Sequence, residues 1–164
     1  RKYEDKRYLG NAIPAVIASW SHSLRYKNLS LSINLRSWLD FDVFNTINMY
    51  YGLSAPVGTN VLRNAYIDNR HIKEEKVLCD YWLEDGSFLK IDAISLGYTL
   101  DMKQWQKIID NINFFFTVRD VACFSMYSGL NPEVNINGLD AGYEWFNNIY
   151  PRTARFTLGA KITF

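Results

Sequence analysis

The sequence has few of the residues that most catalytic and metal sites require. It contains 2 histidines and 2 cysteines in 164 residues, and no acid, base and nucleophile stand together in a catalytic motif. His22 and His71 are isolated, so we expect neither to bind a metal. Asp40 and Asp42 form a carboxylate pair in LDFDVFN, but turn residues at the entry to a loop are the simpler interpretation. We therefore expect no enzyme activity, no cofactor and no metal.

Other absences limit where the chain can act. The formal net charge is +1, so there is no strong electrostatic attraction to nucleic acid or to an anionic membrane surface. No run reaches the roughly 18 consecutive apolar residues of a transmembrane helix. The chain opens on RKYEDKRYLG, which is typical of a polar loop and not of a targeting segment. Cys79 and Cys123 fit no metal motif, and the sequence leaves open whether they pair.

What the sequence does have is strict alternation of apolar and polar residues. In its last segment, YPRTARFTLGAKITF, the residues from Thr153 onward are apolar at even positions and polar or glycine at odd ones. A period of two predicts a β-strand with one apolar and one polar face. The same pattern predicts four more strands: Val16–Lys27 and Leu29–Leu39 with a turn at Lys27 and Asn28, Ser87–Leu100 with a bulge near 92–94, and Asn111–Val121.

The connections between these strands alternate between short and long. About 45 residues separate the second strand from the third, and about 30 the fourth from the fifth, far above usual loop lengths. The connection 101–110 is short and is predicted as one or two helical turns. Strands near the roughly 9–11 residues that cross a bilayer, with long loops on one side, are typical of an outer-membrane β-barrel. Aromatic residues are abundant, with 11 Tyr and 5 Trp, as in the aromatic girdles of such barrels.

In a barrel, the two faces of each strand lie in two different environments. The apolar face would meet lipid, and the basic residues of the polar face would line a water-filled lumen. These lumen-facing residues are Arg25, Arg36, Arg119, Arg155 and Lys161. Five strands cannot close a barrel, because the smallest have about eight, and an open edge in lipid leaves backbone groups unpaired. We therefore expect a piece of a larger polypeptide, or one subunit of an adhesin or binding protein whose barrel is assembled from several chains.

A soluble carbohydrate-binding β-sandwich is the third hypothesis, since a sandwich also buries one face of each strand. Solubility without detergent would favour it. An encoded methionine and signal peptide just upstream of the chain would favour the barrel assembled from several chains.

The sequence also resembles a known family. The ending YPRTARFTLGAKITF, the preceding YSGLNPEVN, the strand SFLKIDAISLGYTL and the long stretch YLGNAIPAVIASWSHSLRYKNLSLSINLRSWLDFDVFN are similar to the SusC/RagA family of TonB-dependent outer-membrane transporters. The resemblance leaves out about residues 54–84. The family often has Gly where this chain has Ser37 and Asp40.

This resemblance implies the all-β fold of a transmembrane barrel of about 22 antiparallel strands. Residues 1–164 would be its C-terminal segment, the last five or so strands, and the plug domain and remaining strands would be absent from this chain. The implied protein is a nutrient importer of the Gram-negative outer membrane that takes up glycans, oligosaccharides or peptides. Its implied partners are a SusD-like surface lipoprotein, TonB acting through the absent N-terminal region, the rest of the barrel polypeptide and outer-membrane lipid.

Two sets of residues carry further expectations. Gly159, Ile162 and Phe164 resemble the terminal signal that the barrel assembly machinery recognises. Trp82, Tyr127 and Trp145 fall in the predicted outer loops, where flat rings suit both sugar faces and apolar peptide groups. These three rings are therefore candidate substrate contacts, with packing of the loops against one another or against the lipoprotein as the alternative.

The resemblance also predicts a topology that can be tested. With the C-terminus of the barrel on the periplasmic side, segments 42–86 and 122–150 lie outside the cell, and Asn28 and 101–110 face the periplasm. Protease added to whole cells is then expected to cut within 54–84 and to spare 101–110, as read from the sizes of the membrane fragments. Cleavage confined to 101–110 would contradict this topology.

Overall fold

The computed structural model describes residues 7–54, 58–72, 76–102, 108–145 and 150–164. The chain divides into two compact units, which we name the sheet unit and the loop unit. The sheet unit contains residues 17–37, 88–124 and 152–164, and the loop unit contains residues 1–16, 38–87 and 125–151. None of the described helices has the length and apolar character that crossing a membrane requires.

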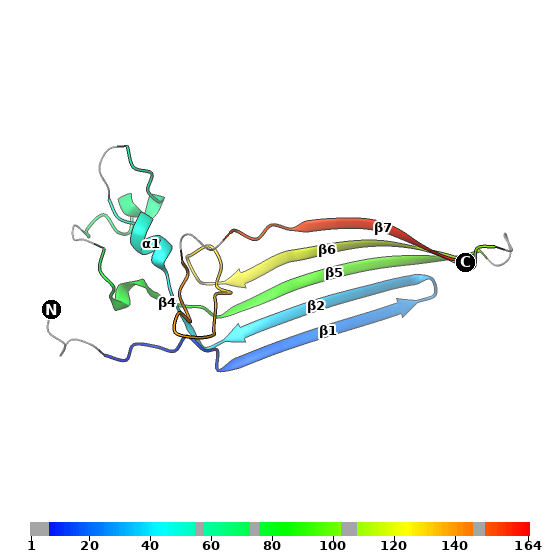
Figure 1. Ribbon diagram of the computed structural model, residues 1–164, viewed down its shortest axis with the longest axis horizontal. Coiled ribbons are helices and arrows are strands. Elements are labelled where there is room, and N and C mark those ends of the chain that lie inside the picture. Colours follow the sequence, from blue (N-terminus) through cyan, green and yellow to red (C-terminus); the bar gives the residue numbers. More distant parts are fainter. Residues whose placement is uncertain (1–6, 55–57, 73–75, 103–107, 146–149) are drawn as a thin grey trace. The chain divides into compact units, whose positions relative to one another are not determined.

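The sheet unit is one five-stranded sheet in the order β1-β2-β5-β6-β7 (Figure 1). Its strands are β1 (Val16–Tyr26), β2 (Leu29–Leu39), β5 (Phe88–Asp101), β6 (Asn111–Ser125) and β7 (Arg155–Thr163). All five predicted strands are confirmed, because side-chain alternation is strong in each. The largest error is in β6, which continues beyond the predicted end at Val121 to Ser125.

The turn between β1 and β2 lies where the alternation changes phase. Lys27 adopts a positive φ of 52°, which a tight two-residue hairpin requires. The carbonyl oxygen of Asn28 accepts a hydrogen bond from the amide of Thr99 at 2.8 Å, so the turn is bonded to the end of β5. The helical turns predicted within 101–110 fall mostly on 103–107, which lie outside the described residues.

The register of β6 and β7 explains one glycine of the last strand. Phe115 lies directly opposite Gly159, and a Cβ atom at position 159 would come within 2.4 Å of the Phe115 ring. Glycine therefore lets the ring lie over the neighbouring backbone, a device that protects a glycine in a sheet. Packing alone gives Gly159 a reason to be there, and the assembly signal of Gly159, Ile162 and Phe164 stays a prediction.

The loop unit contains short elements that alternation did not predict. Strand β3 (Asp42–Phe44) pairs antiparallel with β4 (Leu83–Asp85). Helix α1 (Thr46–Tyr51) begins after Asn45, whose side-chain oxygen accepts the Asn48 amide at 2.8 Å, as an N-cap does. Two 3-10 helices complete the unit, η2 (Arg63–Tyr66) and η3 (Asp80–Trp82). Elements of three to six residues are too short to display a period, which is why segments 42–86 and 122–150 were predicted only as connections.

The loop unit has its own small hydrophobic core. Met49, Leu53 and Trp82 are buried together, and Phe44, Tyr50 and Ile72 pack against them. The Trp82 indole donates a hydrogen bond to the Val77 carbonyl at 3.1 Å, so its one polar group is satisfied. The described part of the long connection between β2 and β5 is therefore folded around its own core.

Asp40 begins this connection with an unusual backbone conformation. Its φ is 59°, in the left-handed region that glycine adopts most readily, and glycine is what the resembling family often has there. Its carbonyl accepts the Ala15 amide at 3.1 Å and its amide donates to the Ser87 hydroxyl at 3.0 Å. The predicted turn at the loop entry is thus confirmed for Asp40, whereas Asp42 lies in β3.

The conformation of Asp40 predicts opposite effects for two substitutions. Asp40→Gly should stabilise the loop entry by up to about 1 kcal/mol, and Asp40→Val should destabilise it by about 1–2 kcal/mol, because a β-branched residue resists positive φ. Both variants keep the two backbone hydrogen bonds. Hydrogen exchange of the Ala15 amide in the full-length protein measures the effect, and faster exchange in Asp40→Gly than in the parent would contradict the argument.

Candidate functional site

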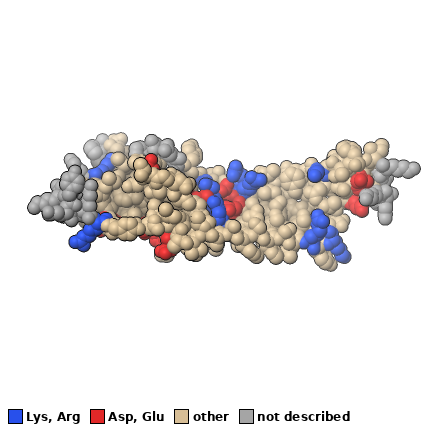
Figure 2. Space-filling view, turned by 60° about the horizontal axis from the view of Figure 1, so that its bottom comes forward, with Lys and Arg blue, Asp and Glu red and all other residues tan. Residues whose placement is uncertain are grey.

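The polar face of the sheet unit carries a cluster of ion pairs. Arg36 donates two hydrogen bonds to the Asp92 carboxylate, at 3.0 and 3.1 Å, and Arg155 donates one to Asp120 at 2.9 Å. A two-point contact between guanidinium and carboxylate is the strong form of this interaction. Figure 2 shows one place where basic and acidic side chains lie together, with further charged side chains separate from it.

Lys90 joins the two ends of this cluster. Its side chain is only 4% exposed, and its ammonium lies 2.9 Å from Asp120 and 3.6 Å from Asp92. A lysine this well buried needs carboxylate partners, because an unpaired charge away from water is very costly. Arg152 also approaches Asp120, at 3.6 Å. We refer to Arg36, Lys90, Asp92, Asp120, Arg152 and Arg155 as the charge cluster.

Strict alternation of side chains did not predict on which face of the sheet Asp92 and Asp120 lie. Asp120 has an even number, which in β6 belongs to the apolar face, but its φ of 53° breaks the alternation and lets it line the same surface as Arg119. In β5, Asp92 and Ser95 both line this surface although they are three residues apart. The change of phase predicted near 92–94 is therefore confirmed. A charge on the apolar phase of a strand was the signal for Asp120.

A depression of about 480 Å³ lies beside the charge cluster. Arg119 and Arg155 line it together with the polar residues Ser32, Asn34, Ser95 and Thr117. The hydroxyls of Ser95 and Thr117 are hydrogen-bonded to each other at 2.7 Å. A neighbouring depression of about 220 Å³ is lined by Phe115, Thr117, Arg119, Arg155 and Thr157. The two arginines thus border both hollows.

The other predicted basic residues lie on the same face of the sheet. Arg25 lines a depression with Thr99 and Asn111 near the Lys27–Asn28 turn. Lys161 lies opposite Asn113, whose amide donates to the Thr99 hydroxyl at 2.7 Å. The five residues predicted to face a lumen therefore share one surface. That this surface lines a lumen stays a prediction.

A second polar site lies in the loop unit, around the carboxylate of Glu144. Segment 142–144 is hydrogen-bonded to β3, because the Phe44 amide donates to the Gly142 carbonyl at 2.7 Å and the Glu144 amide donates to the Phe44 carbonyl at 3.2 Å. The Thr46 hydroxyl donates to the Glu144 carbonyl. These bonds fix the connection between β6 and β7 to the connection between β2 and β5.

Glu144 is fully buried, and its carboxylate is hydrogen-bonded on both oxygens. The Tyr127 hydroxyl donates to one oxygen at 2.7 Å and the Asn131 amide donates to the other at 2.8 Å. Burial raises the pKa of Glu144 above its usual range, and these hydrogen bonds only partly offset the effect. Burial and the adjacent Glu144 also raise the pKa of Tyr127, so its hydroxyl keeps its proton.

Glu84 organises the neighbouring part of the loop unit. Its carboxylate accepts hydrogen bonds from the Asn45 amide group at 2.9 Å and from the Ser128 amide and hydroxyl, both at 2.8 Å. Glu84 also adds its negative charge to the causes that raise the pKa of Glu144. Glu84 thus links three segments that are far apart in the sequence, around positions 45, 84 and 128.

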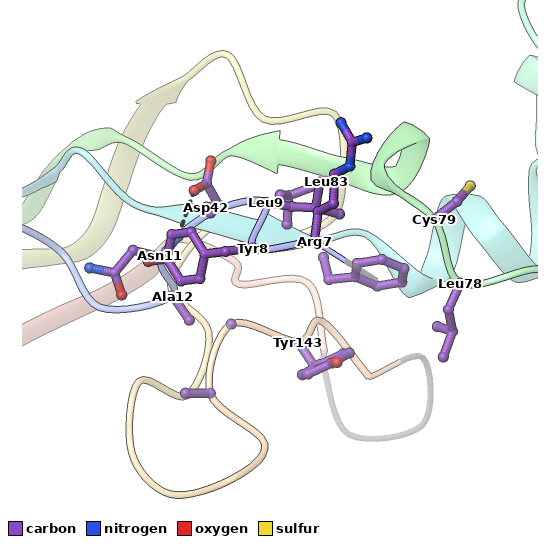
Figure 3. Close-up of a pocket in the computed structure, with 14 residues that line it drawn as sticks. Arg7, Tyr8, Leu9, Asn11, Ala12, Asp42, Leu78, Cys79, Leu83 and Tyr143 are labelled. Atoms are coloured by element: carbon purple, nitrogen blue, oxygen red, sulfur yellow. Dashed lines mark hydrogen bonds between the residues drawn. The ribbon is translucent and has the colours of Figure 1, made fainter. Parts of the chain in front are cut away.

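The loop unit also contains a half-open pocket of about 360 Å³ (Figure 3). Tyr8, Leu9, Leu78, Leu83 and Tyr143 are among its lining residues. Asp42 accepts the Asn11 amide at 2.9 Å, which ties the first described segment to β3. The pocket offers aromatic and aliphatic surface together with the carboxylate of Asp42 and the guanidinium of Arg7, a mixture of apolar surface and a few polar groups that is typical of ligand pockets.

The three aromatic residues predicted as substrate contacts occupy different environments. Trp82 is 3% exposed within the core of the loop unit, and Tyr127 is 8% exposed beside Glu144. Both positions fit the alternative, packing of the loops. Trp145 is 37% exposed and stacks on Tyr143, with ring centroids 5.6 Å apart. Sequence reasoning missed Tyr143, whose signal was its place two residues before Trp145.

No family model matches the sequence. The similar proteins found by sequence comparison are TonB-dependent receptors. The TonB-dependent receptor SusC of Bacteroides thetaiotaomicron is 29% identical over 99% of this chain and 16% of its own length. The TonB-dependent receptor P3 of Formosa agariphila is 23% identical over 98% of this chain and 17% of its own length. The chain therefore spans less than a fifth of these relatives.

Solved structures share the fold. The RagAB peptide importer in its open-open state matches with a TM-score of 0.72 over 93% of this chain and 17% of that chain, at 17% identity. Its closed-closed state gives the same score. The five-stranded sheet is thus similar to part of a barrel wall.

The buried carboxylate of Glu144 predicts a pH dependence. A carboxyl whose pKa is raised by folding stabilises the folded state most at low pH, and this contribution is lost as pH rises through the folded pKa. We expect the loop unit to become less stable as the pH rises above 4.5, the ordinary pKa of a glutamate, and Glu144→Gln to reduce this dependence, since the Tyr127 hydroxyl can accept from the new amide. Hydrogen-exchange protection of the Asn131 amide, corrected for intrinsic exchange, measures the effect.

The matched control for this test is Asp140→Asn, a change of the same kind at an exposed position of the same connection. It should leave the pH dependence of the parent unchanged. Protection that increases with pH in the parent protein would refute the assignment to Glu144.

Proposed function

We propose that the chain forms part of the barrel wall of an outer-membrane nutrient importer, because it is similar to TonB-dependent receptors and to the RagAB peptide importer. The observation that carries this proposal is a single antiparallel sheet with an apolar face and a charged face, similar to a peptide importer over 93% of the chain. The relatives are receptors and importers, so we propose transport without catalysis.

The exposed apolar face supports contact with lipid. Leu158 and Phe156 of β7 are 80% and 70% exposed, and Trp20 of β1 is 53% exposed. Leaving such surface in water costs about 25 cal/mol for each Å². Hydrocarbon removes this cost, and the polar face is then left for a water-filled lumen. A soluble sandwich would need a second layer over the apolar face, and the described residues contain only the two-stranded β3–β4 sheet besides the five-stranded one.

The loop unit supports an extracellular role in capturing solute. Its elements belong to the two long connections, which in outer-membrane barrels lie outside the cell. We propose that the pocket of Tyr8 and Tyr143, with Trp145 stacked beside it, contacts solute or a SusD-like lipoprotein. Peptide is the solute named for RagAB, and glycan or oligosaccharide is the alternative. TonB would supply energy through a part of the receptor that this chain does not contain.

The lipid-facing side can be tested at two neighbouring positions of β7. Leu158 pairs with Phe116 on the apolar face and Thr157 with Thr117 on the polar face. In the full-length receptor, Leu158→Arg should destabilise the barrel by about 2–4 kcal/mol, the cost of a cation at the bilayer midplane. Thr157→Arg should cost far less, because it adds a charge to a surface that already carries Arg155 and Lys161. Heat-modifiable gel migration of the membrane fraction reads the folded state.

A quenching measurement separates lipid contact from simple burial. A fluorophore is attached at position 158 or 157 of a cysteine-free background, and a quencher is placed on the lipid tails. We expect strong quenching at 158 and weak quenching at 157. Equal quenching at the two positions, or none at either, would mean that the apolar face does not meet lipid.

A further inference from the structure

The charges beside the polar depression do not balance. Arg119 and Arg155 are direct partners across β6 and β7, and like charges in such positions repel and destabilise a sheet. Asp120 binds Arg155 at 2.9 Å. Among the described residues, Arg119 makes no ion pair, and its side chain is exposed at the edge of both depressions.

The two nearby acids are already engaged by other cations. Asp120 holds Lys90 and Arg152 with one oxygen and Arg155 with the other. Asp92 holds Arg36 with both oxygens and also faces Lys90. Since these carboxylates have short contacts to other cations, neither can neutralise Arg119. The polar surface therefore has an unmet positive charge at the border of a hollow lined by hydroxyls.

We propose that Arg119, supported by Arg155, is a binding site for a carboxylate group of the transported solute. The planar guanidinium matches a carboxylate in a two-point contact, and the Thr117 hydroxyl borders the same two depressions. This inference rests on the proposed function and deepens it, because it selects acidic solutes. The carboxylate comes from an acidic peptide or from a uronate-containing oligosaccharide.

The surrounding charges favour a carboxylate over a more highly charged group. Asp92 and Asp120 also line the larger depression, and their negative charges repel a doubly charged anion such as phosphate more than a singly charged one. Four cations surround these two acids: Arg36, Lys90, Arg152 and Arg155. The excess of positive charge keeps the local potential favourable for one carboxylate. The site thus has room and charge for one acidic group.

The test uses the full-length receptor in membranes and two matched pairs of probes. One pair is a dye-labelled hexapeptide with two glutamates and its twin with two glutamines. The other is a trigalacturonate and its neutral trigalactoside. We expect the acidic member of at least one pair to bind about tenfold more tightly than its twin, and Arg119→Gln to remove this preference without weakening the neutral twin. The pair that displays the preference identifies the source of the carboxylate.

Two further variants make the result specific. Arg119→Lys keeps the charge and loses the planar fork, so it should retain part of the preference. Lys27→Asn removes one positive charge at the β1–β2 turn, where asparagine tolerates the positive φ. This variant should leave the preference for the acidic probe intact. Heat-modifiable migration confirms that each variant folds.

Three outcomes would overturn the inference. Equal affinity for the twins in the parent protein would do so and leave the importer proposal standing. Equal affinity combined with a lower heat stability of Arg119→Gln would mean that an acidic group of the receptor itself occupies Arg119. Failure of all four probes to bind would reject the carboxylate site and count against the proposed function as well.

Discussion

The two faces of the sheet unit depend on the two-residue period of its strands. Because successive side chains point to opposite faces, one sequence pattern supplies an apolar surface and a charged surface to the same sheet. Thr157 and Leu158 are adjacent in the chain, yet their cross-strand partners are Thr117 and Phe116, one polar and one apolar. A sheet with these two surfaces needs an apolar environment on one face and water on the other, and the wall of an outer-membrane barrel provides both.

The charge cluster forms where this period is interrupted. The positive φ of Asp120 and the change of phase in β5 bring carboxylates to the polar face. Without Asp120, the nearly buried Lys90 would lose a carboxylate partner at 2.9 Å, and removing one member of a buried ion pair is destabilising. The interruptions in the alternation therefore provide carboxylate partners for cations that a regular strand would leave unpaired.

Sequence patterns predicted what is periodic and missed what is not. The bounds of β2 and the turn at Lys27 follow from alternation and its change of phase, and both are as predicted. Position 120 was assigned to the wrong face, because alternation alone does not predict a single left-handed residue within a strand. Glu144 and Lys90 could not be identified as buried, since a charged residue is normally exposed and only its distant partners explain its burial. Those partners come from other strands or loops.

The loop unit is stabilised differently from the sheet unit. Its elements are too short to be stabilised by their own ladders or helical hydrogen bonds, so side-chain carboxylates take over this role. Glu84 and Glu144 together accept hydrogen bonds from Asn45, Tyr127 and Asn131, which lie in two segments that are far apart in the sequence. Each bond to an ionised carboxylate is stronger than a neutral one, but ionising a buried group carries a desolvation cost. The two long connections are consequently held in one arrangement by interactions whose strength depends on protonation, whereas the sheet is held by backbone hydrogen bonds that do not titrate.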